Sequence, residues 1–208
     1  LDAFTRADES PLANGTWAGP ARLAENQLRL VSNQAANAVG GRSASYWSAA
    51  TFGPDMECYV EVPTIPGVGD HVYAFARCSN FGGVTFQGYL LTVIPTNDWY
   101  LERYDLNVGT ILTSNLNGPT PANGDSVGIE CIGSAIKCYH KTGGTWSQVL
   151  SATDATYGGV SSIATGGQAL GFRLDNFSGG TVVTAAAAAP PGHGALLSGF
   201  RNSVIQRV

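Results

Sequence analysis

The feature that most constrains the fold is an alternation of apolar and polar residues, interrupted roughly every 8 to 12 residues by Gly, Pro, Asn or Asp. Successive side chains of a β-strand point to opposite faces, so a period of two predicts strands that are buried on one face. Gly133-Ser134 and Gly143-Gly144 stand between consecutive segments of this kind and are typical of two-residue hairpin turns. The pattern therefore predicts an antiparallel all-β domain.

More than ten segments are expected to form strands, and so many strands require two packed sheets or a barrel. The segments are Leu28–Val31, Ala35–Val39, Ser45–Phe52, Met56–Val62, His71–Cys78, Thr85–Ile94, Trp99–Tyr104, Thr110–Thr113, Ser126–Ile132, Ala135–Lys141, Thr145–Leu150 and Gln168–Phe177. We predict that they build an antiparallel two-sheet β-sandwich with a short C-terminal extension.

The sequence changes character after the last predicted strand. We expect residues 1–180 to form the sandwich and residues 181–194, rich in Ala, Pro and Gly, to form a linker that a Pro-Pro step keeps extended. Residues 195–208 carry apolar side chains near helical spacing, but a segment this short cannot form its own core. We expect it to be an assembly segment that packs on another chain or a second copy through Leu197, Phe200, Val204 and Ile205. The alternatives are that it docks back on the sandwich or stays mobile.

Charged residues are sparse in this chain. Asp, Glu, Lys and Arg make up 12% of the 208 residues, where roughly 25% is usual, and the formal net charge is −4. The chain has no basic cluster that could neutralise a row of phosphates, so we expect no nucleic-acid partner. It has no run of the ~20 apolar residues needed to cross a bilayer, so we expect no membrane insertion.

The cysteines fall in phase with apolar neighbours on the predicted strands. Cys58 shares a predicted strand face with Val60, and Cys78 shares one with Ala76. Cys131 and Cys138 follow the same pattern. This phase predicts buried free thiols, and a Cys58–Cys78 cross-strand disulfide is the alternative. A zinc site is not expected, because no CxxC pair and no histidine cluster accompany the cysteines.

The order of several short segments resembles a known family. These segments are DAFTRADESPL, LRLVSNQA, YWSAATFGPDMECYVEV, HVYAFARCSN, GYLLTV, WYLERYD, GDSVGIECIGSAIKCYHKTGGTW and LGFRLDNFSGG. Together, over residues 1–178, they resemble the concanavalin A-like (laminin-G-like) lectin/glucanase jelly roll, in the form found in minor tail and other virion proteins of phages and in secreted bacterial proteins. The resemblance implies that the first and last strands pair, which would bring Phe4 near Phe177.

A catalytic role finds no positive support in the residues. Hydrolases of the resembled family place carboxylates as E-x-D-x-E or E-x-D-x-x-E on one strand, whereas Asp55, Glu57 and Glu61 are spaced D-x-E-x-x-x-E. The Cα atoms of Glu57 and Glu61 would lie roughly 13 Å apart on a strand, too far for a retaining pair. The lyase motifs of the family are absent and the three histidines are scattered. We therefore predict that the protein is not an enzyme.

Calcium remains an open alternative at the sequence level. Members of the resembled superfamily bind it near the N- and C-terminal strands, where Asp2 and Asp175 would meet. Two carboxylates without flanking ligands are equally typical of turns at strand ends, so no cofactor and no metal site are predicted.

Sugar binding needs exposed aromatic faces flanked by groups that bind hydroxyls. In the segment WYLERYD alternation places Trp99 on one face and Tyr100 and Tyr104 on the other, and one of these faces must be exposed. The predicted carbohydrate-binding residues are Trp99, Tyr100, Tyr104, Asn97, Asp98 and Trp146.

We predict a non-enzymatic virion protein, of a phage tail or head surface, that presents a lectin-like module to glycans of the host envelope. Its expected location is the virion or the extracellular space. Its expected partners are other virion subunits, further copies of itself and a cell-surface glycan. A secreted bacterial hydrolase or lyase on the same fold is the alternative. A decoration protein without a ligand is the third hypothesis, and it differs in whether the candidate aromatic side chains are exposed.

Overall fold

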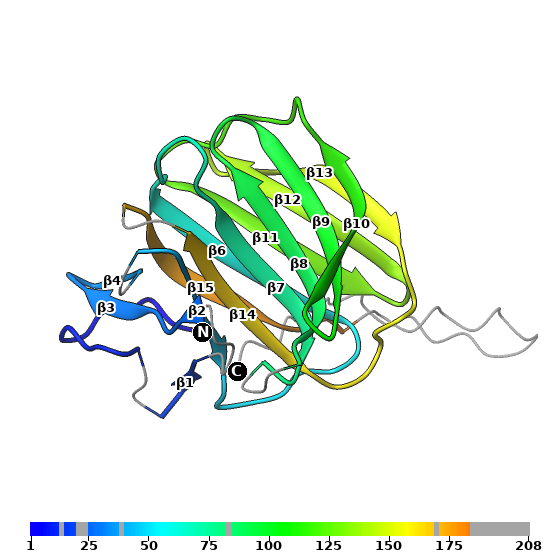
Figure 1. Ribbon diagram of the computed structural model, residues 1–208, viewed down its shortest axis with the longest axis horizontal. Helices are drawn as coiled ribbons and strands as arrows, with labels where there is room; N and C mark the ends of the chain where they lie inside the picture. The colour runs from blue at the N-terminus through cyan, green and yellow to red at the C-terminus, as the bar shows by residue number, and fades with distance from the viewer. Residues whose placement is uncertain (13–14, 20–24, 38–39, 82–84, 169–170, 184–208) are drawn as a thin grey trace, which may run out of the picture.

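The computed structural model describes residues 1–12, 15–19, 25–37, 40–81, 85–168 and 171–183. In this part of the chain the regular structure consists of β-strands alone, which form the two layers shown in Figure 1. The described residues contain no helix that could span a membrane. Each strand pairs with its neighbours in the antiparallel sense, except that the short strand β2 runs parallel to β5.

One layer is an eight-stranded sheet of order β1-β5-β14-β7-β8-β9-β10, with β2 attached to β5. Its strands are β1 (Trp17–Ala18), β2 (Glu25–Asn26), β5 (Arg42–Trp47), β7 (Val72–Ser79), β8 (Gln87–Ile94), β9 (Asp98–Asp105), β10 (Val108–Asn115) and β14 (Ser162–Gln168).

The other layer is a seven-stranded sheet of order β13-β12-β11-β6-β15-β4-β3. Its strands are β3 (Arg29–Val31), β4 (Gln34–Ala36), β6 (Met56–Thr64), β11 (Asp125–Ile132), β12 (Ala135–Thr142), β13 (Thr145–Thr153) and β15 (Arg173–Thr181). Two antiparallel sheets that exchange strands in this way form a jelly-roll β-sandwich, as the sequence predicts.

The main hydrophobic core lies between the two sheets. Strand β6 shows the alternation most clearly, because its inward side chains Met56, Cys58, Val60 and Val62 are fully buried and the residues between them are not. They pack with the inward side chains of β7, β8, β11 and β12. Burying an aliphatic side chain of this size contributes roughly 1.5–3 kcal/mol, so the contact between the sheets dominates the stability of the fold.

The two ends of the described chain meet, as the resemblance implies. Asp2 forms a β-bridge with Phe177 of β15. The ring of Trp17 lies between Phe4 and Phe177, at centroid distances of 5.7 and 4.7 Å, and also contacts Trp47. Strand pairing and aromatic packing together hold the N-terminal segment against β15.

A second apolar cluster lies on the outer face of the eight-stranded sheet. Tyr73, Phe75 and Leu90 point away from the main core and are nevertheless buried. Phe81 and Phe86, from the connection between β7 and β8, pack edge-on against the ring of Phe75 at 5.3 and 5.7 Å. This connection covers part of the sheet, which explains why β7 and β8 are buried on both faces.

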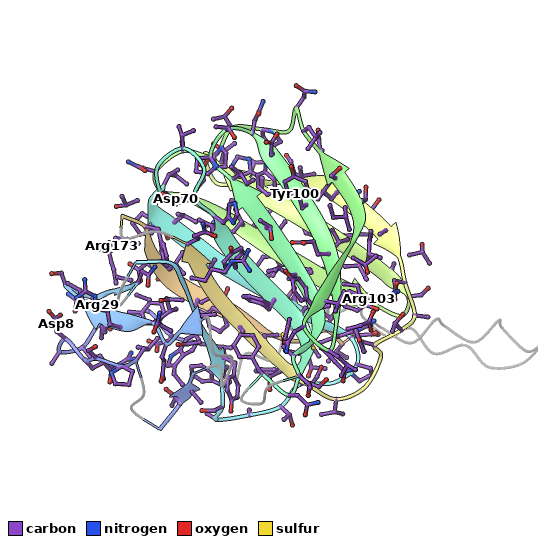
Figure 2. All side chains as sticks on the ribbon, in the orientation of Figure 1. Asp8, Arg29, Asp70, Tyr100, Arg103 and Arg173 are labelled. Carbon is purple, nitrogen blue, oxygen red and sulfur yellow. The ribbon has the colours of Figure 1, made fainter. Side chains whose placement is uncertain are left out.

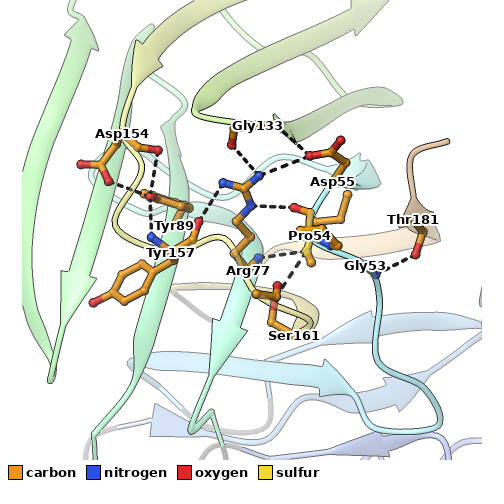
Figure 3. A network of polar contacts seen from close by, with 12 residues as sticks. Gly53, Pro54, Asp55, Arg77, Tyr89, Gly133, Asp154, Tyr157, Ser161 and Thr181 are labelled. Carbon is orange, nitrogen blue, oxygen red and sulfur yellow. Dashed lines mark hydrogen bonds and ion pairs between the residues drawn. The ribbon is translucent and has the colours of Figure 1, made fainter. Parts of the chain in front are cut away.

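Arg77 connects three loops at the end of β7 (Figure 3). Its guanidinium is buried and donates hydrogen bonds to the backbone carbonyls of Pro54, Gly133 and Tyr157 at 2.7–2.8 Å. One carboxylate oxygen of Asp55 lies 3.7 Å from the same group. The backbone of Arg77 adopts a φ of +51°, at a register shift between β7 and β8.

All four cysteines are buried free thiols, as their phase predicts, and no Cys58–Cys78 disulfide is formed. Burial raises the pKa of the Cys58 and Cys131 thiols to about 12, so they stay protonated at neutral pH. The face predicted for Cys78 is wrong. The register shift near Arg77 turns its side chain to the outer cluster, whereas the other three thiols lie between the sheets.

Two strand predictions fail in instructive ways. The strand predicted over Gln168–Phe177 joins the end of β14 to the start of β15, with Phe172 between them, and most of β14 was not predicted. The strand predicted over Ser45–Phe52 ends at Trp47. Of the linker predicted over residues 181–194, Thr181 is the last residue of β15, and residues from 184 onward lie outside the described residues. The predicted assembly residues also lie outside them: they are Leu197, Phe200, Val204 and Ile205.

Candidate functional site

The candidate site lies on the outer face of the eight-stranded sheet, where side chains stand in rows across neighbouring strands. Tyr73 of β7, Thr92 of β8 and Tyr100 of β9 are register partners and form one row. Figure 2 labels Tyr100 on this sheet. Leu90 and Glu102 are partners in the next row, so aromatic, hydroxyl and carboxylate groups share one surface.

These rows line a cavity of about 260 Å³. Its lining residues come from five strands or their ends and are Arg42, His71, Tyr73, Phe75, Leu90, Thr92, Ile94, Tyr100, Glu102, Tyr104 and Ile111. We call this cavity the groove. Its mixture of apolar walls and a few polar groups is typical of sites that bind small molecules or short segments of a polymer.

One end of the groove carries a chain of polar groups. Nδ1 of His71 lies 2.9 Å from the hydroxyl of Tyr73, and that hydroxyl and the guanidinium of Arg42 both donate to Oε1 of Gln168. Burial, followed by the nearby charge of Arg42, lowers the pKa of His71, so its imidazole is neutral at neutral pH. This end therefore offers one cation and several neutral hydrogen-bonding groups.

The carboxylate of Glu102 lies in the groove and accepts a hydrogen bond from Oγ1 of Thr92 at 2.8 Å. A carboxylate held in this way keeps further lone pairs for hydroxyl donors. Tyr100 and Tyr104 follow on either side along β9, and the absence of a side chain at Gly109 lets the Tyr104 ring lie close to β10. Aromatic rings beside a carboxylate and a guanidinium match the chemistry of a sugar, which has apolar C–H faces and hydroxyl edges.

The structure divides the predicted carbohydrate-binding residues into three groups. Tyr100 and Tyr104 line the groove. Trp99 is fully buried in the main core, where its indole N–H donates to the carbonyl of Pro119 at 2.9 Å, so its ring cannot stack on a ligand. The prediction of Trp99 is therefore wrong.

The remaining predicted residues lie outside the groove. Asn97 occupies the turn between β8 and β9 with a φ of +84°, and Asp98 begins β9 opposite Ile94. Trp146 is 40% exposed, but it stands on β13 of the other sheet. The aromatic residues predicted as one set thus occupy opposite sides of the sandwich.

Several groove residues were not predicted, namely Arg42, His71, Tyr73, Thr92 and Glu102. Glu102 had a usable signal, since it alternates with Tyr100 and Tyr104 on the same face of β9. The sequence does not reveal that Arg42 of β5 lies near His71 and Tyr73. These residues come together because β14 pairs with both β5 and β7.

The carboxylates considered for catalysis do not meet in the groove. Glu57 and Glu61 stand on β6 in the seven-stranded sheet, where they accept hydrogen bonds from Tyr59 and Asn176. Among the described residues that line the groove, Glu102 is the only carboxylate. Asp98 shares its strand face four residues away, at a Cα separation of roughly 13 Å.

The place where Asp2 and Asp175 were considered as calcium ligands does not fit that ion. The carboxylate of Asp2 accepts hydrogen bonds from Arg6, the indole of Trp17 and the amide of Phe4. A carboxylate committed to a guanidinium and two N–H donors has little capacity left for a cation. The described residues contain no group of three or more His, Cys, Asp or Glu side chains that could hold a metal.

Comparison with solved structures shows the same fold in proteins of distant sequence. A carbohydrate-binding module, CBM66 from Bacillus subtilis, matches with a TM-score of 0.63 and 13% identity over 79% of this chain and 95% of its own. The exoplasmic/lumenal domain of VIP36, in a Ca²⁺/Man-bound form, matches with a TM-score of 0.62 and 9% identity over 82% and 85%. The β-glucanase of Bacillus licheniformis matches with a TM-score of 0.58 and 12% identity over 88% and 97%.

No protein-family model matches the sequence, and no curated protein matches it. The solved structures show that the fold is that of concanavalin A-like lectins, carbohydrate-binding modules and glucanases. Identities this low show architecture alone, and the same architecture carries both binding and catalysis.

Proposed function

We propose that this protein is a non-enzymatic glycan-binding protein and that the groove on the eight-stranded sheet is its binding site. The observation that carries the proposal is the set of Tyr100, Tyr104 and Glu102 on one face of β9, inside a cavity that Arg42 and His71 border. Tyrosine rings offer surfaces for the C–H faces of a sugar ring, and the polar groups bind its hydroxyls.

We further propose that the module is carried on a virion, at a phage tail or head surface, and binds glycans of the host envelope. The support is the resemblance in sequence to virion proteins together with a groove too small to hold more than a short piece of a polymer. A single site of this kind binds weakly, and many copies on one particle convert weak binding into stable attachment.

The test is retention of the purified protein on immobilised bacterial envelope polysaccharides and on whole cells, with release of new reducing or unsaturated ends measured in the same samples. We expect retention without new ends. Tyr100→Ala should weaken retention about tenfold, the equivalent of roughly 1.4 kcal/mol, because it removes a ring from the groove. Val160→Ala, at an exposed position in the loop before β14, is the matched control and should retain wild-type binding. Equal retention of the Tyr100 variant and the wild type would overturn the assignment of the groove.

A glycan hydrolase is the second candidate, because the carboxylate of Glu102 lies in the groove and the fold is shared with a glucanase. Asp98, on the same face of β9, stands outside the groove with its Cα roughly 13 Å away. Hydrolysis needs two carboxyl groups about 5 Å apart for retention of configuration or about 6.5–9.5 Å for inversion. New reducing ends that disappear in a Glu102→Gln variant would establish the hydrolase instead of the binding protein.

A further inference from the structure

Trp146 stands out among the tryptophans of this chain. It is 40% exposed, whereas Trp17 is 3% exposed and Trp99 is fully buried. Trp47 is partly buried against the main core. Burial of an indole ring is favourable, and the exposed part of the Trp146 ring offers an apolar surface to a ligand.

The ring of Trp146 lies across the outer face of the seven-stranded sheet. Trp146 belongs to the edge strand β13, and Tyr59 belongs to β6, with β12 and β11 between them. The two ring centroids are nevertheless 4.8 Å apart, with an angle of 51° between the ring planes. Strands are spaced about 4.8 Å, so both side chains must lean toward each other over the sheet.

Gly128 of β11 makes this arrangement possible. A Cβ atom at Gly128 would lie 1.9 Å from Cδ1 of Tyr59, so the tyrosine ring rests directly on the backbone of β11. The two rings form an aromatic surface, and Lys141 places its ammonium 5.7 Å from the centroid of Trp146. We call Tyr59, Trp146 and the side chains beside them the Trp146 surface.

Carboxylates flank the rings. Glu57 of β6 and Glu130 of β11 are direct register partners on this face. The hydroxyl of Tyr59 donates to Glu57 at 3.1 Å, and that of Tyr139 donates to Glu130 at 3.2 Å. On its other side Glu130 is the register partner of Lys137 of β12, whose ammonium offsets part of the repulsion between the two carboxylates.

We infer that the Trp146 surface is a second glycan-binding site, independent of the groove and on the opposite face of the sandwich. The rings provide a surface for the apolar face of a sugar, and the carboxylates of Glu57 and Glu130 accept hydrogen bonds from neighbouring hydroxyls. The ammonium groups of Lys137 and Lys141 on the same face balance the two carboxylates, so the surface has no net charge that would attract an acidic sugar. The ligand class is therefore a neutral polysaccharide with vicinal hydroxyls, and one chain can hold two polysaccharide strands at once.

The test uses the fluorescence of the full chain, since Trp146 is the most exposed tryptophan and dominates quenching by acrylamide. The probes are mannan, dextran and mixed-linkage β-glucan, with polygalacturonate as the acidic comparison. At least one neutral polysaccharide should lower the quenching constant of the wild type by twofold or more, and polygalacturonate should not. In Trp146→Phe the protection should be lost. The absence of protection by every neutral probe, or equal protection in Trp146→Phe, would overturn the inference.

The two sites are separated by one further variant. Tyr100→Ala changes only the groove, so it should leave the protection of Trp146 within experimental error of the wild type. Loss of that protection in Tyr100→Ala would mean that the groove alone binds glycan, and the second site would be rejected. If retention on polysaccharide depends on Trp146 and not on Tyr100, the Trp146 surface stands and the proposed function of the groove fails.

Discussion

At the scale of single residues, Arg77 shows how one side chain can fix loops that are distant in sequence. Its guanidinium is buried and donates hydrogen bonds to three backbone carbonyls, one from each of three loops. Arg77→Met keeps an unbranched side chain at the same positive φ, so the change isolates the loss of the guanidinium. A hydrogen bond from a charged donor contributes roughly 1.5–3 kcal/mol, and three such bonds are lost together. We expect a loss of about 3 kcal/mol in the free energy of unfolding, measured by urea denaturation.

The control for this prediction is Arg173→Met. Arg173 is half-buried and its guanidinium donates to the carbonyl of its neighbour Phe172 at 2.9 Å, so its loss should cost less than about 1 kcal/mol. Equal effects of the two substitutions would contradict the role given to Arg77.

Trp99 and Tyr100 show how far the candidate site can be predicted from the sequence. Alternation correctly separates Trp99 from Tyr100, but it does not say which face of β9 is inside, because both faces of this segment carry an aromatic ring. The answer depends on β8 and β10, which pack on both sides of β9 and place Trp99 against the core. Alternation thus assigns each residue of a strand to one of two faces, but it does not tell which face packs against the other sheet.

At the scale of elements, the strands from β6 to β13 follow the predicted ranges within a few residues, because apolar alternation marks the strands and turn residues mark their ends. Strand β14 was not predicted, because its sequence, SIATGGQ, contains two glycines and few large apolar residues. The glycines have a packing role. A Cβ at Gly166 would lie 2.3 Å from the carbonyl oxygen of Ser43 and 2.8 Å from Cα of Ala44.

Gly166→Ala should therefore destabilise the pairing of β14 with β5. The obstructing atoms belong to the backbone, which cannot move aside as a side chain can, and overpacking of this kind costs typically 1–3 kcal/mol. Thermal unfolding followed by circular dichroism measures the effect. Gly159→Ala is the matched control, because a Cβ there meets nothing within 4 Å, and it should leave the melting temperature nearly unchanged. A melting temperature of Gly166→Ala equal to that of the control would contradict the packing argument.

At the scale of the whole molecule, carboxylates hold the loop between β13 and β14 to the eight-stranded sheet. The carboxylate of Asp154 is partly desolvated, which raises its pKa, but hydrogen bonds from Thr156, Tyr89 and Arg103 outweigh this effect and lower the pKa to about 2. Asp105, bonded by the Tyr157 hydroxyl and by Arg103, also has a lowered pKa. These bonds join β8 and β9 to the loop that leads into β14, and Figure 3 shows the bond between Asp154 and Tyr89 of β8.

The lowered pKa of Asp154 makes the stability of the protein depend on pH. A carboxyl group whose pKa is lower in the folded than in the unfolded state stabilises the fold above its unfolded value, near 3.9, and this contribution is lost as the pH falls toward 2. Asp125, whose burial is outweighed by hydrogen bonds from Ala122 and His140, acts in the same direction. Asp175 acts in the opposite direction, because burial and then the nearby Glu61 raise its pKa.

We therefore expect the melting temperature to fall between about pH 5 and pH 2, since more of these groups have lowered than raised pKa values. Asp154→Asn removes the titrating group while keeping its size. Its melting temperature at pH 7 should be lower than that of the wild type, and the difference should shrink as the pH falls to 2. A constant difference over that range would show that Asp154 acts through shape and not through its charge.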